Sequence, residues 1–100
     1  MSSQRRRVRV TDAFFEQLDQ QLEPDRGPDG QPSATDFLVM ELPADVERFA
    51  TGFHDLPEMI DGFHSGRMLI APGVLVRAIA IYGLLMTDDS IEIIGVELDL

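Results

Sequence analysis

Residues 66–98 read GRMLIAPGVLVRAIAIYGLLMTDDSIEIIGVEL, and this stretch determines the fold expected for the chain. It contains three apolar runs rich in β-branched residues, Arg67–Ala71, Val74–Met86 and Ile91–Leu98. A Pro-Gly pair separates the first two runs, and a Thr-Asp-Asp-Ser tetrad separates the last two. Proline presets φ, glycine accepts positive φ and aspartate bonds nearby backbone, so both breaks are typical of turns. We therefore predict a three-stranded antiparallel meander, with the upstream residues covering one of its faces in an α+β domain.

The middle run, Val74–Met86, is apolar on both of its alternating faces, which predicts the central strand of the meander. Arg77 is the exception, because a buried arginine is unfavourable unless it is paired or reaches solvent. One interpretation is a cross-strand ion pair with Glu92 or Glu97. The other is an arginine that faces an anion on an open sheet face, with Arg67 one strand away as its companion.

Upstream of the meander, the sequence predicts a short strand followed by a helix. Arg5–Val10 alternates weakly and suits an edge strand, and a basic arm that contacts nucleic acid or an acidic partner is the alternative. Thr11 or Asp12 can cap a helix, and Ala13–Leu22 places Phe and Leu at helical spacing. Glu23–Ser33 is rich in glycine and proline and predicts a surface loop.

A second helical region follows, opened by Ser33 and Asp36 in a capping arrangement. Its apolar side chains form one helical stripe: Leu38, Leu42, Val46, Phe49 and Phe53. Pro43 either kinks a single helix near Leu42 or starts a second helix. A strand at Phe37–Leu42 is a further alternative, but we favour helix throughout with a break at Leu42-Pro43. His54–Gly66 is expected to be a loop or one loose turn.

Length and composition indicate one small soluble domain, residues 1–100. The chain has 44% hydrophobic residues, enough for a core. It has no cysteine, which excludes a disulfide scaffold, a thiolate metal site and a cysteine nucleophile. No segment resembles a signal peptide, and the longest apolar run is too short to span a membrane. We therefore expect a cytoplasmic protein without membrane contact.

The charge is strongly negative and unevenly distributed. The formal net charge is −10, all eight basic residues are arginine, and four of them lie in Arg5–Arg9. The remaining four arginines face 18 acidic residues. Such a body repels phosphate backbones, so we expect weak binding of naked nucleic acid at most. It favours solubility and basic partners.

Few residues are candidates for catalysis or metal binding. His54 and His64 lie in one loop segment with three acids between them, where they could ligate a divalent metal or act as general acid or base. Their spacing matches no metal motif, and no nucleophile, P-loop or dinucleotide motif is present. Tyr82 is one further candidate. We therefore expect no metal and no cofactor.

The layout of an N-terminal strand, helices and a C-terminal meander resembles the RelE/ParE superfamily of toxin–antitoxin proteins. The closest local similarity is the hairpin of residues 67–82, RMLIAPGVLVRAIAIY. In that family an arginine-bearing strand turns through a short glycine-containing loop into a second strand with another arginine. Only Arg67 and Arg77 match these positions.

The resemblance implies a small toxin-like domain that pairs with an antitoxin laid across it. Some members cut messenger RNA on the ribosome with Arg or Lys plus a late Tyr or His, and others target DNA gyrase. This chain has no lysine, and no His or Tyr follows Tyr82. A nuclease needs cations there to stabilise developing negative charge, so the sequence argues against ribonuclease activity.

Two function classes therefore stay open from the sequence. The first is a RelE/ParE-like toxin or an inactive relative of one. The second is a small acidic binding module, such as an inhibitor or immunity-type protein that covers a basic partner surface. Both predict a protein partner, either an antitoxin or a target protein, and a homodimer is also open.

Overall fold

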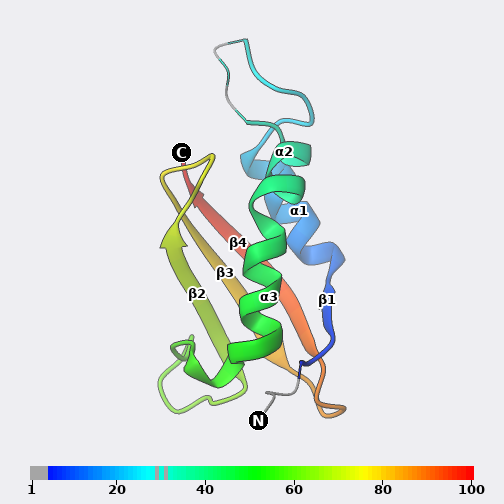
Figure 1. Cartoon of the computed structure of the whole chain (residues 1–100), viewed down its shortest axis with the longest axis vertical. Coiled ribbons are helices and arrows are strands. Elements are labelled where there is room, and N and C mark those ends of the chain that lie inside the picture. The colour runs from blue at the N-terminus through cyan, green and yellow to red at the C-terminus, as the bar shows by residue number, and fades with distance from the viewer. Residues whose placement is uncertain (1–4, 29, 31) are drawn as a thin grey trace.

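The structure, a computed structural model, describes residues 5–28, 30 and 32–100, and positions 29 and 31 of the predicted 23–33 loop lie outside them. Its sheet has the strand order β1-β4-β3-β2. The strands are β1 (Val8–Val10), β2 (Gly66–Pro72), β3 (Ala78–Leu85) and β4 (Ile91–Asp99). Strands β2, β3 and β4 form the predicted antiparallel meander, and β1 pairs with β4 in parallel (Figure 1).

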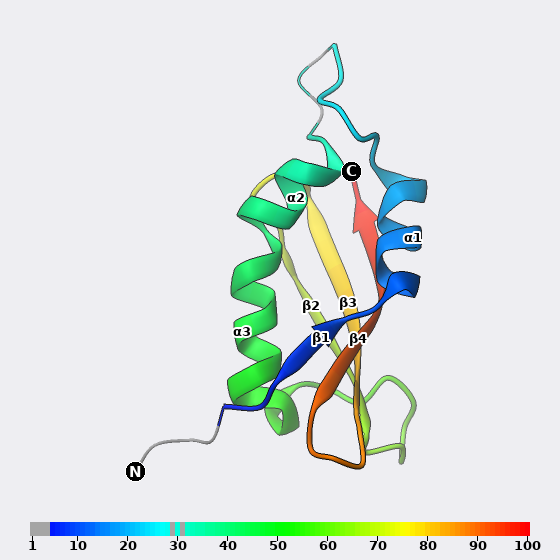
Figure 2. The ribbon, with the colours of Figure 1, turned by 90° about the vertical axis from the view of Figure 1, so that its right-hand side faces the viewer.

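The helices lie between β1 and β2 in the chain, and this arrangement confirms the α+β class. They are α1 (Asp12–Gln21), α2 (Ala34–Met40) and α3 (Leu42–Gly52), and the short 3-10 turn η1 (Phe53–Asp55) follows α3. Figure 2 shows α2 and α3 on one side of the sheet and α1 beside β4. Among the described residues, no helix has both the length and the apolar character needed to span a bilayer.

One core joins the helices to the covered face of the sheet. The alternate strand residues that point into it include Leu69, Ile79, Ile81, Ile93 and Val96. The helices contribute aromatic and leucine side chains, namely Phe14, Leu18, Phe37, Phe49 and Phe53. Burial of this apolar surface is the main favourable term in folding.

Pro43 separates two helices and does not kink a single one. α2 ends before Glu41, and Pro43 lies in the first turn of α3, where its missing N–H leaves no intrahelical bond unmade. The strand alternative at Phe37–Leu42 is therefore wrong. Ser33 and Asp36 form the predicted capping box. The predicted stripe faces the core, with Leu42, Phe49 and Phe53 buried and the other two members partly buried.

The first two predicted elements are confirmed. β1 is an edge strand inside the predicted Arg5–Val10 segment, and it leads directly into α1. The side chain of Thr11 caps that helix by accepting the N–H of Phe14, and its hydroxyl donates to the carbonyl of Ile93 at 2.8 Å. This second bond ties the start of α1 to β4.

β3 is an inner strand as predicted, but it is shorter than the apolar run. Val74–Arg77 form a bend, and the strand begins at Ala78. The carboxylate of Glu41 accepts the N–H groups of Val74 and Leu75, which removes these donors from any strand ladder. The prediction of strand over these four residues is wrong because a contact with a distant carboxylate outweighs their β-propensity.

Two glutamine side chains of α1 form hydrogen bonds with the backbone groups at the edge of β4, beyond the point where β1 ends. Gln17 accepts the N–H of Val96 at 3.0 Å, and Gln21 accepts the N–H of Leu98 at 2.7 Å and donates to the carbonyl of Val96 at 2.8 Å. The amide groups thus take the place of a further strand. An edge covered in this way is protected from pairing with another chain.

Replacing Gln21 with leucine should lower the free energy of unfolding by about 1–2 kcal/mol, because the Leu98 N–H and the Val96 carbonyl lose their partner. Urea denaturation measures this loss. The control is Gln20→Leu on the exposed side of the same helix, which should change stability by less than about 0.5 kcal/mol. Equal losses in the two variants would contradict the edge-capping role.

Candidate functional site

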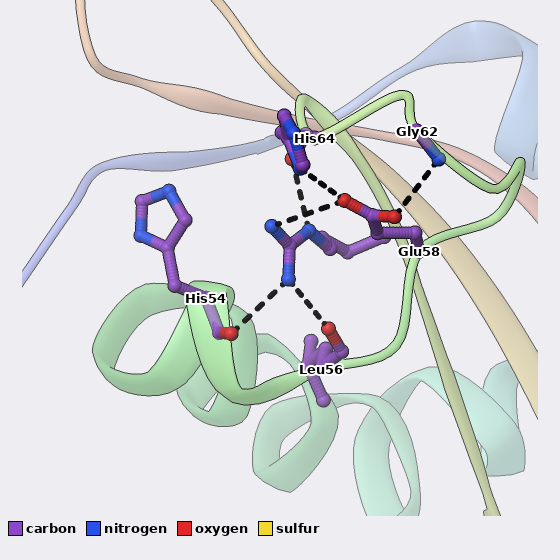
Figure 3. Close-up of polar contacts among 6 residues, drawn as sticks. His54, Leu56, Glu58, Gly62 and His64 are labelled. Carbon is purple, nitrogen blue, oxygen red and sulfur yellow. Dashed lines mark hydrogen bonds and ion pairs between the residues drawn. The ribbon is translucent and has the colours of Figure 1, made fainter.

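Arg67 is buried, and its guanidinium group forms hydrogen bonds with the loop that precedes β2. The residue is 8% exposed. Its Nε donates to the carbonyl of His64 at 2.9 Å, and Nη1 donates to the carbonyls of His54 at 3.1 Å and Leu56 at 2.8 Å (Figure 3). The group also lies 5.7 Å from the ring centroid of Phe53. These donors point into the protein, so Arg67 organises the 54–64 segment.

Arg77 and Arg67 do not share a site. In the β2–β3 register Gly66 pairs with Leu84 and Pro72 with Ala78, so the two arginines lie at opposite ends of the hairpin. At the rise of a strand this separates them by roughly 20 Å. The hypothesis that the two arginines lie close together on adjacent strands is therefore wrong.

Arg77 lies in the bend before β3 and is exposed, so it is not an arginine within an apolar central strand. No ion pair involves it within the described part of the chain. The acids expected as its partners are engaged elsewhere: Glu92 pairs with Arg9, and Glu97 accepts the hydroxyl of Tyr82. An exposed arginine needs no buried counter-charge, which explains why Arg77 is tolerated without either acid.

His54 and His64 are both exposed and are not brought together on a common ligand. The Nδ1 atom of His64 contacts the carboxylate of Glu58, whose other oxygen accepts the N–H of Gly62 at 3.1 Å (Figure 3). The Gly62 N–H, with His64 and Arg67 nearby, holds the pKa of Glu58 below its usual range. Over residues 5–28, 30 and 32–100, no group of three His, Asp or Glu side chains is placed to hold a metal ion.

Tyr82 donates its hydroxyl to Glu97 Oε1 at 3.1 Å. Partial burial, with the neighbouring Glu97 charge, raises the pKa of Tyr82 above its ordinary value. A phenol held in its neutral form beside a carboxylate serves as a hydrogen-bond donor and not as a base at neutral pH.

Three of the four N-terminal arginines form ion pairs within the fold. Arg5 pairs with Glu47, Arg6 with Asp89 at 3.2 Å, and Arg9 with Glu92. A cavity of about 460 Å³ lies beside β1, and both signs of charge line it: Arg7 and Arg9 opposite Asp88 and Glu92. An anion at Arg9 would compete with Glu92, which already pairs with this arginine.

The face of the sheet opposite the core is the largest feature that sequence reasoning missed. We call it the outer face and define it by the strand residues that alternate with the core positions: Met68, Ile70, Pro72, Ala78, Ala80, Tyr82, Leu84, Glu92, Glu97 and Asp99. All of these residues are partly or fully exposed, and Ile70 is 62% exposed. Met59 and Phe63 of the preceding loop lie over Gly66, so the loop closes one end of the face.

Cross-strand rows give the outer face two chemical halves. Ile70 pairs with Ala80, which pairs with Glu97, and in the next row Pro72 pairs with Ala78, which pairs with Asp99. The β2 and β3 half is therefore mainly apolar, with small side chains at Ala78 and Ala80, and the β4 half is acidic. The face therefore presents an apolar strip next to an acidic strip.

A β-bulge produces the acidic half. The pairing of β3 with β4 shifts between Tyr82 and Gly83, which brings Glu92 and Glu97 to the same face although they are an odd number of residues apart. Simple alternation along the sequence places these two acids on opposite faces. The glycine at position 95 is a signal for such a bulge.

No protein-family model matches this chain, and neither a curated protein nor a solved structure shows significant similarity to it. The surfaces described above are therefore the basis for inferring its function.

Proposed function

We propose that this chain is a small acidic protein-binding module, and that the outer face of its sheet receives a partly basic segment of a partner protein. The observation that carries this proposal is the row Ile70–Ala80–Glu97, in which an exposed isoleucine and a small residue lie beside a carboxylate. Small side chains on β3 let a partner approach the sheet closely.

The two halves of the face make different contributions to binding. Burial of the apolar half contributes about 25 cal/mol for each Å² removed from water. The carboxylates of Glu97 and Asp99 contribute attraction for cations and faster association at low salt. An arginine-rich partner segment suits both halves, because the arginine stem is apolar and its head is cationic.

Charge decides between a foreign partner and a second copy of this chain. Two copies would each bring a net charge of −10, and their mutual repulsion opposes a stable dimer at the outer face. The contact with a basic partner relieves this repulsion. We therefore assign the face to a basic protein.

A second candidate function is a RelE/ParE-like toxin-type protein of a toxin–antitoxin pair. The element order, one strand followed by helices and a three-stranded meander, supports this candidate because it is the layout that the resemblance implies. Arg67 is bonded to carbonyl groups and Arg77 lies roughly 20 Å away, so such a protein would act by binding and not by cutting RNA. Growth inhibition on expression, relieved by the product of an adjacent gene, would favour this candidate.

Ile70→Glu should weaken partner binding at least tenfold, because it places a carboxylate in the apolar half of the outer face. The probe is the product of the adjacent gene, co-expressed with this chain and titrated against each variant by calorimetry. Val39→Glu is the matched control, because Val39 is 67% exposed on α2 and lies outside the outer face. The proposal would be contradicted if the two variants bound this partner with equal affinity, or if the partner that binds tightly proved to be an acidic protein.

A further inference from the structure

Glu41 is a buried carboxylate at the junction of α2 and α3 that holds the bend of residues 73–77. Its side chain is among the least exposed charged groups of the chain, at 4%. Oε1 accepts the N–H of Val74 and, at 3.1 Å, the N–H of Leu75. Oε2 is buried and has no hydrogen-bond partner within the described residues.

Asp45 lies one helical turn after Glu41 and is likewise a buried carboxylate. It is 7% exposed, and its Oδ2 is buried with no hydrogen-bond partner within the part of the chain that the structure describes. Two buried carboxylates that influence each other electrostatically resist the loss of both protons, because the second charge is repelled by the first and is poorly solvated.

The bend fits tightly over Glu41. A Cβ atom at Gly73 would lie 2.8 Å from Oε2 of Glu41 and 2.5 Å from the carbonyl oxygen of Val76. Only glycine allows the backbone to come this close to the carboxylate. The position of the Glu41 carboxylate therefore sets the backbone of the bend.

We propose that protonated Asp45 keeps the 73–77 bend closed against α3, because the Glu41 carboxylate that holds the bend is then free of repulsion from a second buried charge. While Asp45 is protonated, the carboxylate of Glu41 accepts the N–H groups of Val74 and Leu75. When the proton is lost, two buried charges repel each other and the bend loosens. The proposal concerns the isolated chain and does not depend on the proposed binding function.

The charged groups around Asp45 set the pH at which this happens. Burial raises the pKa of Asp45 from 3.8 to about 6; the charge of Glu41 adds to the rise, and that of Arg48 opposes it. From the bend, residues 73–76 contribute no titratable side chain, and Arg77 is exposed. Because the folded pKa is raised, the stabilisation is present below pH 3.8 and is lost as pH rises through about 6.

Amide hydrogen exchange of Val74 and Leu75 tests the proposal. After correction for intrinsic exchange, their protection should fall about tenfold between pH 5 and pH 7.5, the ratio that a shift of the Asp45 pKa from 3.8 to about 6 implies. Asp45→Asn should keep both amides protected over this range, because the neutral amide retains the low-charge state. Asp19→Asn, which removes an exposed acid on α1, should keep the pH dependence of the parent chain.

The carboxyl ¹³C titration of Asp45 provides an independent readout. Its midpoint should lie near pH 6 and should move downward in Glu41→Gln, because the neighbouring charge is removed. Glu41→Gln also serves if Asp45→Asn does not fold, since glutamine can still accept the two N–H groups. A midpoint near pH 4, or protection that is equal at pH 5 and pH 7.5, would overturn the proposal.

Discussion

Replacing Arg67 with methionine should lower the free energy of unfolding by about 3–5 kcal/mol, the largest loss that we expect from a single polar residue. Arg67 is 8% exposed, and its guanidinium group donates to the carbonyls of His54, Leu56 and His64. Without it, the buried carbonyl oxygen of Leu56 and the partly buried ones of His54 and His64 lose their partner, and an unsatisfied buried acceptor costs about 1–3 kcal/mol. Methionine keeps much of the volume, so the loss reports the polar contacts of the guanidinium group, including its ion pair with Glu58 at 3.9 Å.

Urea denaturation of two further variants separates this explanation from a general effect of charge. Arg77→Met removes an exposed arginine of the same hairpin and should change stability by less than about 0.5 kcal/mol. Arg67→Lys keeps the charge but cannot donate along three directions in one plane, so its loss should be intermediate. If Arg67→Met and Arg77→Met are equally stable, the hydrogen bonds of Arg67 contribute nothing to the free energy of unfolding, and the role assigned to this residue is wrong.

Replacing Phe49 with alanine should lower the free energy of unfolding by about 3–5 kcal/mol, because a fully buried ring is removed from the centre of the core. The ring lies directly on Gly83 of β3: a Cβ atom at that position would approach the Phe49 ring to 2.6 Å. Phe15→Ala is the control, since Phe15 is exposed on α1, and its loss should be below about 1 kcal/mol.

The contact between Phe49 and Gly83 predicts non-additive energies. Gly83→Ala alone should cost about 1–3 kcal/mol, because the new methyl group collides with the ring. In the double variant, Phe49→Ala with Gly83→Ala, the methyl group enters the space that the ring vacated. The double variant should therefore be more stable than the sum of the single losses predicts, by about 1 kcal/mol. Strict additivity would show that the two residues do not touch.

Tertiary contacts decided the features that bear on function. The 74–77 segment has the composition of a strand, yet it bends because Glu41, more than thirty residues earlier, takes the N–H groups of Val74 and Leu75. The sequence suggests that Arg67 and Arg77 lie close together, but the β2–β3 register puts them at opposite ends of the hairpin. Both outcomes depend on which distant residues meet, and no local pattern carries that information.

The outer face could not be predicted from the sequence either. Its acidic half exists because one shift of register in β4 brings Glu92 and Glu97 to the same side, against the alternation of the sequence. Its apolar half was indistinguishable from a buried strand, because Ala78 and Ala80 suit either environment. Whether such residues are covered depends on where the helices pack, which is a property of the whole fold.

The sequence by itself determined the elements and their order, because these follow from local chemistry. The capping box at Ser33 and Asp36, the five-residue apolar stripe and the turn residues of the meander each act over a few neighbouring positions, whereas the structure decided that Pro43 starts a second helix. The tertiary structure alone decided the ends of β3, the partners of the arginines, the burial of Glu41 and Asp45, and the open face of the sheet. These depend on contacts between residues far apart in the chain, whose energies are set by packing and register.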